Sequence, residues 1–140
     1  MSLPAVLAPL FVQVALTFGL LTWLAYRRVS LIGRGAVKPR DIALREPNWP
    51  PRVLQLQNAV SNQFELPVLF YVLTILSIIT RHADFVFVVL AWVFVLLRLV
   101  HAAIHVTDND LRRRGAVFIT GATVLIVMWA IFMLRIMTGT

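Results

Sequence analysis

The chain has 140 residues, of which 60% are hydrophobic and 14% are charged, whereas a soluble domain has about 45–50% apolar and about 25% charged residues. This composition excludes a water-soluble globular domain and indicates one membrane domain over residues 1–140. The formal charge is +7 and cysteine is absent, which excludes disulfides, CxxC redox chemistry and cysteine nucleophiles. The basic residues flank apolar runs, as in membrane proteins, so we expect no nucleic-acid binding.

The first expected helix covers residues 4–27, because Pro4 to Tyr26 is an uncharged run of 23 residues and such a run can cross about 30 Å of hydrocarbon. No basic segment precedes it, which argues against a cleaved signal peptide. The basic segment from Arg27 to Pro51 contains closely spaced glycines and prolines. It is therefore expected to be a loop.

The second expected helix covers residues 51–80, with a polar early half and an uncharged later half. Pro67 removes a backbone hydrogen bond to residue 63, so a kink is expected just beyond Glu65. The third helix, residues 85–106, has Asp84 in the N-cap position, and the fourth covers residues 112–137. The predicted fold is therefore all-α, an integral membrane four-helix bundle.

The distribution of basic residues predicts the direction of the helices. Ten Lys and Arg lie in the first and third connections, against Arg81 and Arg135 at the opposite ends of the helices. Because short cytoplasmic loops carry an excess of Lys and Arg, we expect the first and third connections in the cytoplasm and both termini on the other side. The lack of a targeting segment favours a bacterial inner membrane.

Polar residues form one stripe on the second expected helix and one on the third. In an antiparallel pair joined near Arg81 and His82, residues whose numbers add to about 163 lie at the same depth. Three pairs satisfy this sum: Glu65 with Arg98, Asn62 with His101, and Asn58 with His105. The layer could be a structural ion pair between helices or a hydrated ligand pocket, and buried charges in membranes favour the pocket.

Two further features bear on chemistry. His101 and His105 have the i, i+4 spacing of metal ligands, but no glutamate or cysteine accompanies them, so we expect no metal. Arg112, Arg113 and Arg114 stand at the start of the fourth helix, where the helix dipole is already positive. They either bind an anion there or simply mark the positive flank.

These residues resemble the MAPEG family, the membrane-associated proteins of eicosanoid and glutathione metabolism, over nearly the whole chain. The resemblance is carried by the segments Asn62-Gln63-Phe64-Glu65-Leu66-Pro67 and Arg98-Leu99-Val100-His101-Ala102-Ala103-Ile104-His105, and by the basic cluster from Arg112. The chain differs at three points: Asn58 replaces a frequent arginine, His105 replaces a tyrosine, and one residue rather than two separates Glu65 from Pro67.

The resemblance implies a homotrimer that holds glutathione at subunit interfaces and takes lipophilic small molecules from membrane lipid. It places Asn62 and Glu65 on the polar groups of glutathione, together with Asn58, Arg98, His101 and His105, and it makes Arg112 the catalytic group beside the thiolate. The reaction would be conjugation of an apolar electrophile or reduction of a lipid hydroperoxide.

Two other functions stay open at this point. The first is a non-catalytic lipid-binding protein of the same fold, which the missing arginine at Asn58 favours. The second is a small proton-coupled transporter, because an intramembrane glutamate is what proton exchange needs. An arginine at the depth of Glu65 and the strong charge bias argue against this transporter.

Overall fold

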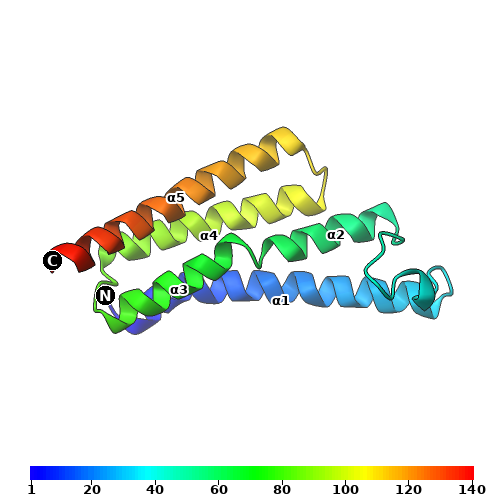
Figure 1. Ribbon diagram of the computed structural model, residues 1–140, viewed down its shortest axis with the longest axis horizontal. Coiled ribbons are helices and arrows are strands. Elements are labelled where there is room, and N and C mark those ends of the chain that lie inside the picture. Colours follow the sequence, from blue (N-terminus) through cyan, green and yellow to red (C-terminus); the bar gives the residue numbers. More distant parts are fainter.

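The computed structural model describes all residues 1–140, and all its regular secondary structure is helical. Its elements are α1 (Leu3–Gly33), the single-turn helix η1 (Pro39–Asp41), α2 (Pro51–Asn62), α3 (Leu66–Ile79), α4 (Phe85–Val106) and α5 (Leu111–Thr138). Together α2 and α3 form one rod, so the molecule is a bundle of four rods with both termini at the same end (Figure 1). The predicted four-helix bundle is confirmed.

Helix α1 is longer than expected, since it continues through Arg27 and Arg28 to Gly33. Arginine is a good helix former, so the positive charges that end the apolar run do not end the helix. Termination comes at Gly35, which has a φ of +74°, a backbone conformation that glycine adopts without steric cost. The predicted boundary at residue 27 was therefore wrong.

The second rod is broken rather than merely kinked. Helix α2 ends at Asn62 and α3 begins at Leu66, and the amides of Gln63, Phe64 and Glu65 bond to oxygens three residues earlier. Pro67 stands in the first turn of α3, where its missing N–H is tolerated. The predicted span over residues 51–80 is therefore present as Pro51–Ile79, but it is interrupted at residues 63–65, close to the predicted kink.

Side-chain caps fix the start of the last two helices. Asp84 accepts a hydrogen bond from the Phe87 amide at 3.0 Å, and Asp110 accepts one from the Arg112 amide at 3.1 Å. Each carboxylate satisfies one of the orphan donors of a first helical turn. Helix α4 consequently has the expected bounds, and α5 extends the expected range by one residue at each end.

The buried apolar residues form two clusters on either side of the break. One lies mainly between α3, α4 and α5 and contains Val6, Phe70, Leu73, Phe87, Val88, Ala91, Phe94, Val95, Leu125 and Met128. The other joins α1, α2 and the long first connection and contains Leu20, Leu24, Val37, Trp49, Val53, Leu56, Ala59, Val60 and Ala102. The break thus lies where one core gives way to the other.

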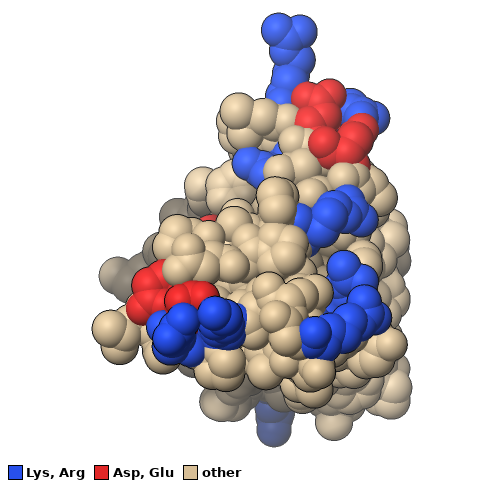
Figure 2. Space-filling model, turned by 90° about the vertical axis from the view of Figure 1, so that its right-hand side faces the viewer, with Lys and Arg blue, Asp and Glu red and all other residues tan.

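One end of the bundle carries most of the charge, and we call it the basic end. It contains the α1–α2 and α4–α5 connections and ten of the 13 Lys and Arg residues. Figure 2 views this end and shows Lys and Arg side chains spread around it, with smaller groups of acidic side chains beside them. The opposite end holds both termini and the α3–α4 turn (Figure 1).

Candidate ligand-binding site

A polar cavity of about 340 Å³ lies where the break in the second rod faces α4 and the first turns of α5. Nine residues line this cavity: Asn62, Glu65, His101, His105, Leu111, Arg114, Gly115, Phe118 and Ile119. Four of them are among the residues that the sequence predicted. Because Glu65, Leu111 and Ile119 are exposed, the cavity opens at the surface of the single chain.

Arg98 contacts Asn62, one of the lining residues, and is only 1% exposed. Its Nη2 donates to the main-chain oxygen of Asn62 at 3.3 Å and to the Asn62 side-chain oxygen. Its Nε and Nη1 are buried and have no partner. Buried polar atoms in folded proteins are nearly always hydrogen-bonded, so these two donors indicate a missing polar partner.

The two histidines add further unpaired polar atoms. Their rings are perpendicular with centroids 5.6 Å apart, and the His101 ring also lies 5.8 Å from that of Phe118. The Nδ1 atoms of both His101 and His105 are buried without a partner. No group of three His, Asp or Glu side chains is arranged to hold a metal ion. The two buried Nδ1 atoms are thus free to form hydrogen bonds.

The predicted pairing between the second and third rods was wrong in detail. Asn62 contacts Arg98 rather than His101, Glu65 forms no ion pair, and Asn58 is exposed and lies outside the cavity. At the level of His105 the partner is Gln55, whose Nε2 donates to the His105 main-chain oxygen at 2.7 Å.

The break explains this shift of register. On the α3 side of the break, the Phe70 and Phe94 rings are in contact with centroids 5.0 Å apart. On the α2 side, Asn62 contacts Arg98. Eight residues along the second rod therefore cover the length that four residues cover on α4. A continuous helix would have kept the sum of paired residue numbers constant.

The three arginines at the start of α5 have different surroundings. Arg113 pairs with Asp108 and with Asp110, the latter at 3.1 Å. Arg114 donates to the Asn109 side chain and lines the cavity. Arg112 is exposed, and its side chain has no hydrogen bond within the chain. Arg114 is thus the arginine that this chain turns toward its own cavity.

Some site residues could have been found from spacing alone. Leu111, Arg114, Gly115 and Phe118 recur every three or four residues, which places them on one face of a helix. That stripe starts one residue after the Asp110 cap. Arg112, Arg113 and Arg114 occupy different positions around the helix, and only Arg114 shares the face that lines the cavity.

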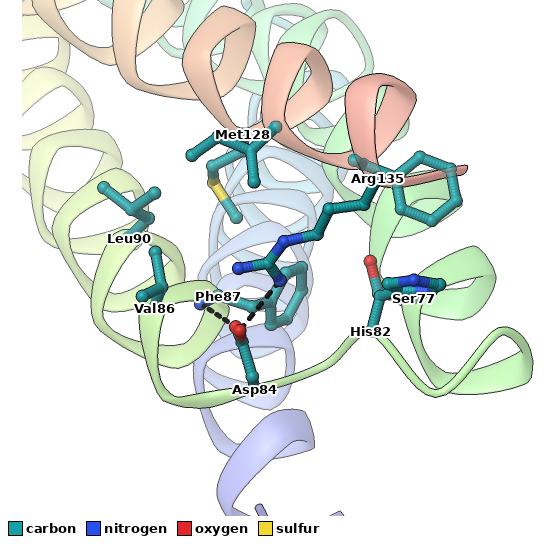
Figure 3. Close-up of a pocket in the computed structure, with 10 residues that line it drawn as sticks. Ser77, His82, Asp84, Val86, Phe87, Leu90, Met128 and Arg135 are labelled. Carbon is teal, nitrogen blue, oxygen red and sulfur yellow. Dashed lines mark hydrogen bonds and ion pairs between the residues drawn. The ribbon is translucent and has the colours of Figure 1, made fainter. Parts of the chain in front are cut away.

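A second polar cluster lies at the opposite end of the bundle (Figure 3). Arg135 pairs with Asp84 at 2.8 Å, and His82 contacts the Thr140 main-chain oxygen at 3.1 Å through Nε2. The enclosed volume is only about 20 Å³, enough for one water molecule. This cluster fastens the α3–α4 turn to the end of α5 and is too small for a substrate.

The structure first defines a class of protein. Each of the four rods is long and apolar enough to cross a membrane, and charged groups lie between them at the level of the break. The molecule is therefore a multi-pass integral membrane protein with a polar cavity inside its bundle.

The sequence then defines the family. The MAPEG family model matches residues 6–134, so the chain belongs to the MAPEG family. Comparisons with curated proteins and with solved structures give no significant match.

Proposed function

We propose that this protein is a membrane-embedded glutathione transferase or peroxidase that acts on lipophilic electrophiles or lipid hydroperoxides. The observation that carries this proposal is the buried guanidinium of Arg98, which donates to the cavity residue Asn62 and keeps two nitrogens unpaired. Burying a charge is costly unless it is paired. An anionic ligand in the cavity would supply the partner that the chain itself does not.

Glutathione has the chemistry that this cavity would accept. It carries two carboxylates, one ammonium and one thiol. The cavity offers Arg114 for a carboxylate and Glu65 for the ammonium, and Arg98, which contacts the lining residue Asn62, would bind the other carboxylate. The Asn62 amide and the two imidazoles would satisfy its peptide groups. An arginine near the sulfur favours the thiolate, which makes the cofactor the nucleophile in a chain without cysteine.

A groove for an apolar substrate adjoins this cavity. It has a volume of about 590 Å³ and only hydrophobic lining residues: Leu66, Leu69, Ala122, Leu125, Ile126, Trp129, Ala130 and Met133. Leu66 directly follows Glu65, and Ala122 is one turn beyond Phe118. A lipophilic substrate in this groove would therefore have one end beside the bound thiol.

A homotrimer is part of the proposal, because the cavity is open on one side. Arg112 is exposed and unpaired beside this opening, so it is free to reach a thiol held at an interface with a second copy. Light scattering of the detergent-solubilised protein measures the oligomeric mass. A mass of one chain would contradict an interfacial site.

The first test is ultraviolet difference spectroscopy of the purified protein titrated with glutathione, which detects the thiolate. We expect a saturable band that decreases strongly in Arg114→Ala or Arg112→Ala, whichever residue faces the sulfur. Arg113→Ala is the matched control, because Arg113 is held by Asp108 and Asp110. Absence of both a band and calorimetric binding would refute the proposal.

Two product assays then identify the reaction. In conjugation, the glutathione sulfur forms a bond to carbon of the electrophile and a leaving group or proton completes the balance. In peroxide reduction, two glutathione molecules are oxidised to the disulfide while the hydroperoxide becomes an alcohol and water. Mass spectrometry distinguishes the conjugate from glutathione disulfide.

The alternative function is a non-catalytic lipid-binding protein of the same fold. The specific observation in its favour is that the apolar groove is larger than the polar cavity, about 590 Å³ against about 340 Å³. Retention of a lipid in the groove without any thiolate band would support this alternative.

A further inference from the structure

A second polar cavity, of about 390 Å³, lies between the C-terminal half of α1, α2 and the long first connection. It is separate from the proposed glutathione site, because α2 turns Gln57 and Ser61 toward this cavity and Asn62 toward the other. Its volume lies within the range of about 300–1,000 Å³ that small-molecule sites occupy. Nothing in the proposed transferase reaction uses it.

The polar end of this cavity contains two opposite charges with free atoms. The Arg28 guanidinium lies 5.1 Å from the Trp49 ring centroid and donates through Nη2 to Gln57, while its Nε is buried without a partner. Glu46 accepts from the Leu44 amide at 3.0 Å with Oε1, and its Oε2 is buried without a partner.

These two charges do not satisfy each other. No ion pair joins Arg28 to Glu46, although both line the same cavity. A buried donor and a buried acceptor that lack partners each cost free energy. A ligand that carries both an anionic and a cationic group would satisfy both atoms at once.

The other end of the cavity is apolar. Leu21 and Leu24 line this end, and Arg28 lines the polar end of the same cavity. The three residues lie at positions i, i+3 and i+7 of α1, which places them on one face of the helix. The stripe runs from the basic end toward the middle of the bundle. The cavity therefore offers charged groups where lipid headgroups lie and hydrocarbon contacts where acyl chains begin.

We infer that this cavity binds a phospholipid with a primary ammonium headgroup, of the phosphatidylethanolamine type. Arg28 and the neighbouring Arg45 hold the phosphate, and Glu46 accepts hydrogen bonds from the ammonium. Such charge-assisted hydrogen bonds are stronger than neutral ones. The first methylene groups of the acyl chains lie along Leu21 and Leu24.

The lining also selects among headgroups. A quaternary ammonium is recognised by a cage of aromatic rings, but Trp49 is the single aromatic residue of this cavity and is already stacked with Arg28. A glycerol headgroup would offer Glu46 only neutral hydroxyl donors, which bind a carboxylate more weakly than an ammonium does. The ethanolamine headgroup is therefore preferred to both the choline and the glycerol headgroup.

The experiment is native mass spectrometry of the full chain in mild detergent, supplied with equal amounts of dioleoyl phosphatidylethanolamine, phosphatidylcholine and phosphatidylglycerol. We expect about one ethanolamine lipid per chain, retained about tenfold better than either competitor. Glu46→Gln should abolish that preference. Asp41→Asn is the matched control, since it removes the same charge from the same connection outside the cavity, and it should keep the preference.

A second variant guards against misfolding of the first. Ser61→Phe leaves all charges in place but adds bulk to the exposed wall of the cavity, and it should lower retention of every lipid. Equal retention of the three lipids by the natural chain would overturn the inference. Displacement of the ethanolamine lipid by glutathione would also overturn it, because the cavity would then belong to the cofactor.

Discussion

Arg98 donates from one nitrogen, Nη2, to both the main-chain and the side-chain oxygen of Asn62, at the residue where α2 ends. This contact ties the break in the second rod to the middle of α4. It uses only part of the guanidinium, since Nε and Nη1 stay unpaired in a side chain that is 1% exposed. Replacing Arg98 separates the structural from the functional role of these atoms.

Replacing Arg98 by Met should weaken glutathione binding by at least about tenfold while changing thermal stability little. The variant leaves Asn62 without its donor, which costs about 1–3 kcal/mol. It also removes a buried and incompletely paired charge, whose burial costs several kcal/mol in the natural chain. This gain offsets the loss of the hydrogen bond, so the free energy of unfolding should change little. Calorimetric titration and thermal unfolding in detergent measure the two effects.

Arg98→Lys provides the matched control for this prediction. It keeps the charge but loses the planar fork of the guanidinium, so glutathione binding should recover only in part. A large loss of unfolding temperature in Arg98→Met with unchanged glutathione binding would mean that Arg98 serves the fold alone.

A pair of buried glutamines should stabilise the break. The Gln13 Nε2 donates to the Gln63 Oε1 at 2.9 Å, and the Gln63 Nε2 donates to the Ala59 oxygen at 3.0 Å. Gln13→Leu should destabilise the protein by about 1 kcal/mol, as hydrogen bonds between membrane helices do. The double variant Gln13→Leu, Gln63→Leu should cost less than the sum of the single variants.

Chemical unfolding in mixed micelles measures this double-mutant cycle. The control pair is Thr74→Ala and Thr123→Ala, because each hydroxyl bonds only within its own helix. Strict additivity at the two glutamines would show that the Gln13–Gln63 bond does not couple α1 to the break.

Features set by residues next to one another in the sequence could be predicted, whereas features set by packing between helices could not. Asp84 is a cap that acts on its own helix, so the start of α4 was predictable from local chemistry. The end of α1 was not, because a charge marks where hydrocarbon ends rather than where a helix ends. The shift between Asn62 and His101 was also hidden, since the number of residues absorbed by the break depends on packing against α4.

The ion pair between Asp84 and Arg135, at the end of the bundle that holds both termini, should make the stability of the protein depend on pH. Burial opposes ionisation of Asp84, but the hydrogen bond from the Phe87 amide and the contact with Arg135 outweigh it, so its pKa lies below the ordinary value of 3.8. A depressed folded-state pKa means that the stabilisation is present above the unfolded pKa and is lost as the pH falls through the folded one.

Asp84→Asn should therefore lower the unfolding temperature slightly at neutral pH and have less effect in strong acid. Asparagine still caps a helix, so the variant isolates the charge, and a partly exposed pair contributes about 1 kcal/mol or less. Unfolding scans of the natural and variant chains from pH 6 to pH 3 measure the difference. An equal difference at every pH would contradict the role of ionisation.

The direction of the chain in the membrane is testable because the sequence contains no cysteine. Lys38→Cys places a thiol at the basic end, and Ser2→Cys places one at the opposite end; both positions are exposed. In intact bacterial cells, an impermeant maleimide should label Ser2→Cys at once and Lys38→Cys only after permeabilisation. The reverse pattern would invert the predicted orientation.

The position of the break between two separate hydrophobic clusters has a consequence for how the molecule opens. Regions with their own cores tend to unfold as separate cooperative units. The cluster around Phe70 and Phe94 contains residues of all four rods, whereas the cluster around Trp49 and Val53 depends on an irregular connection. Amide hydrogens of α2 should therefore exchange with solvent before those of α4, and the basic half should loosen while the other half stays folded.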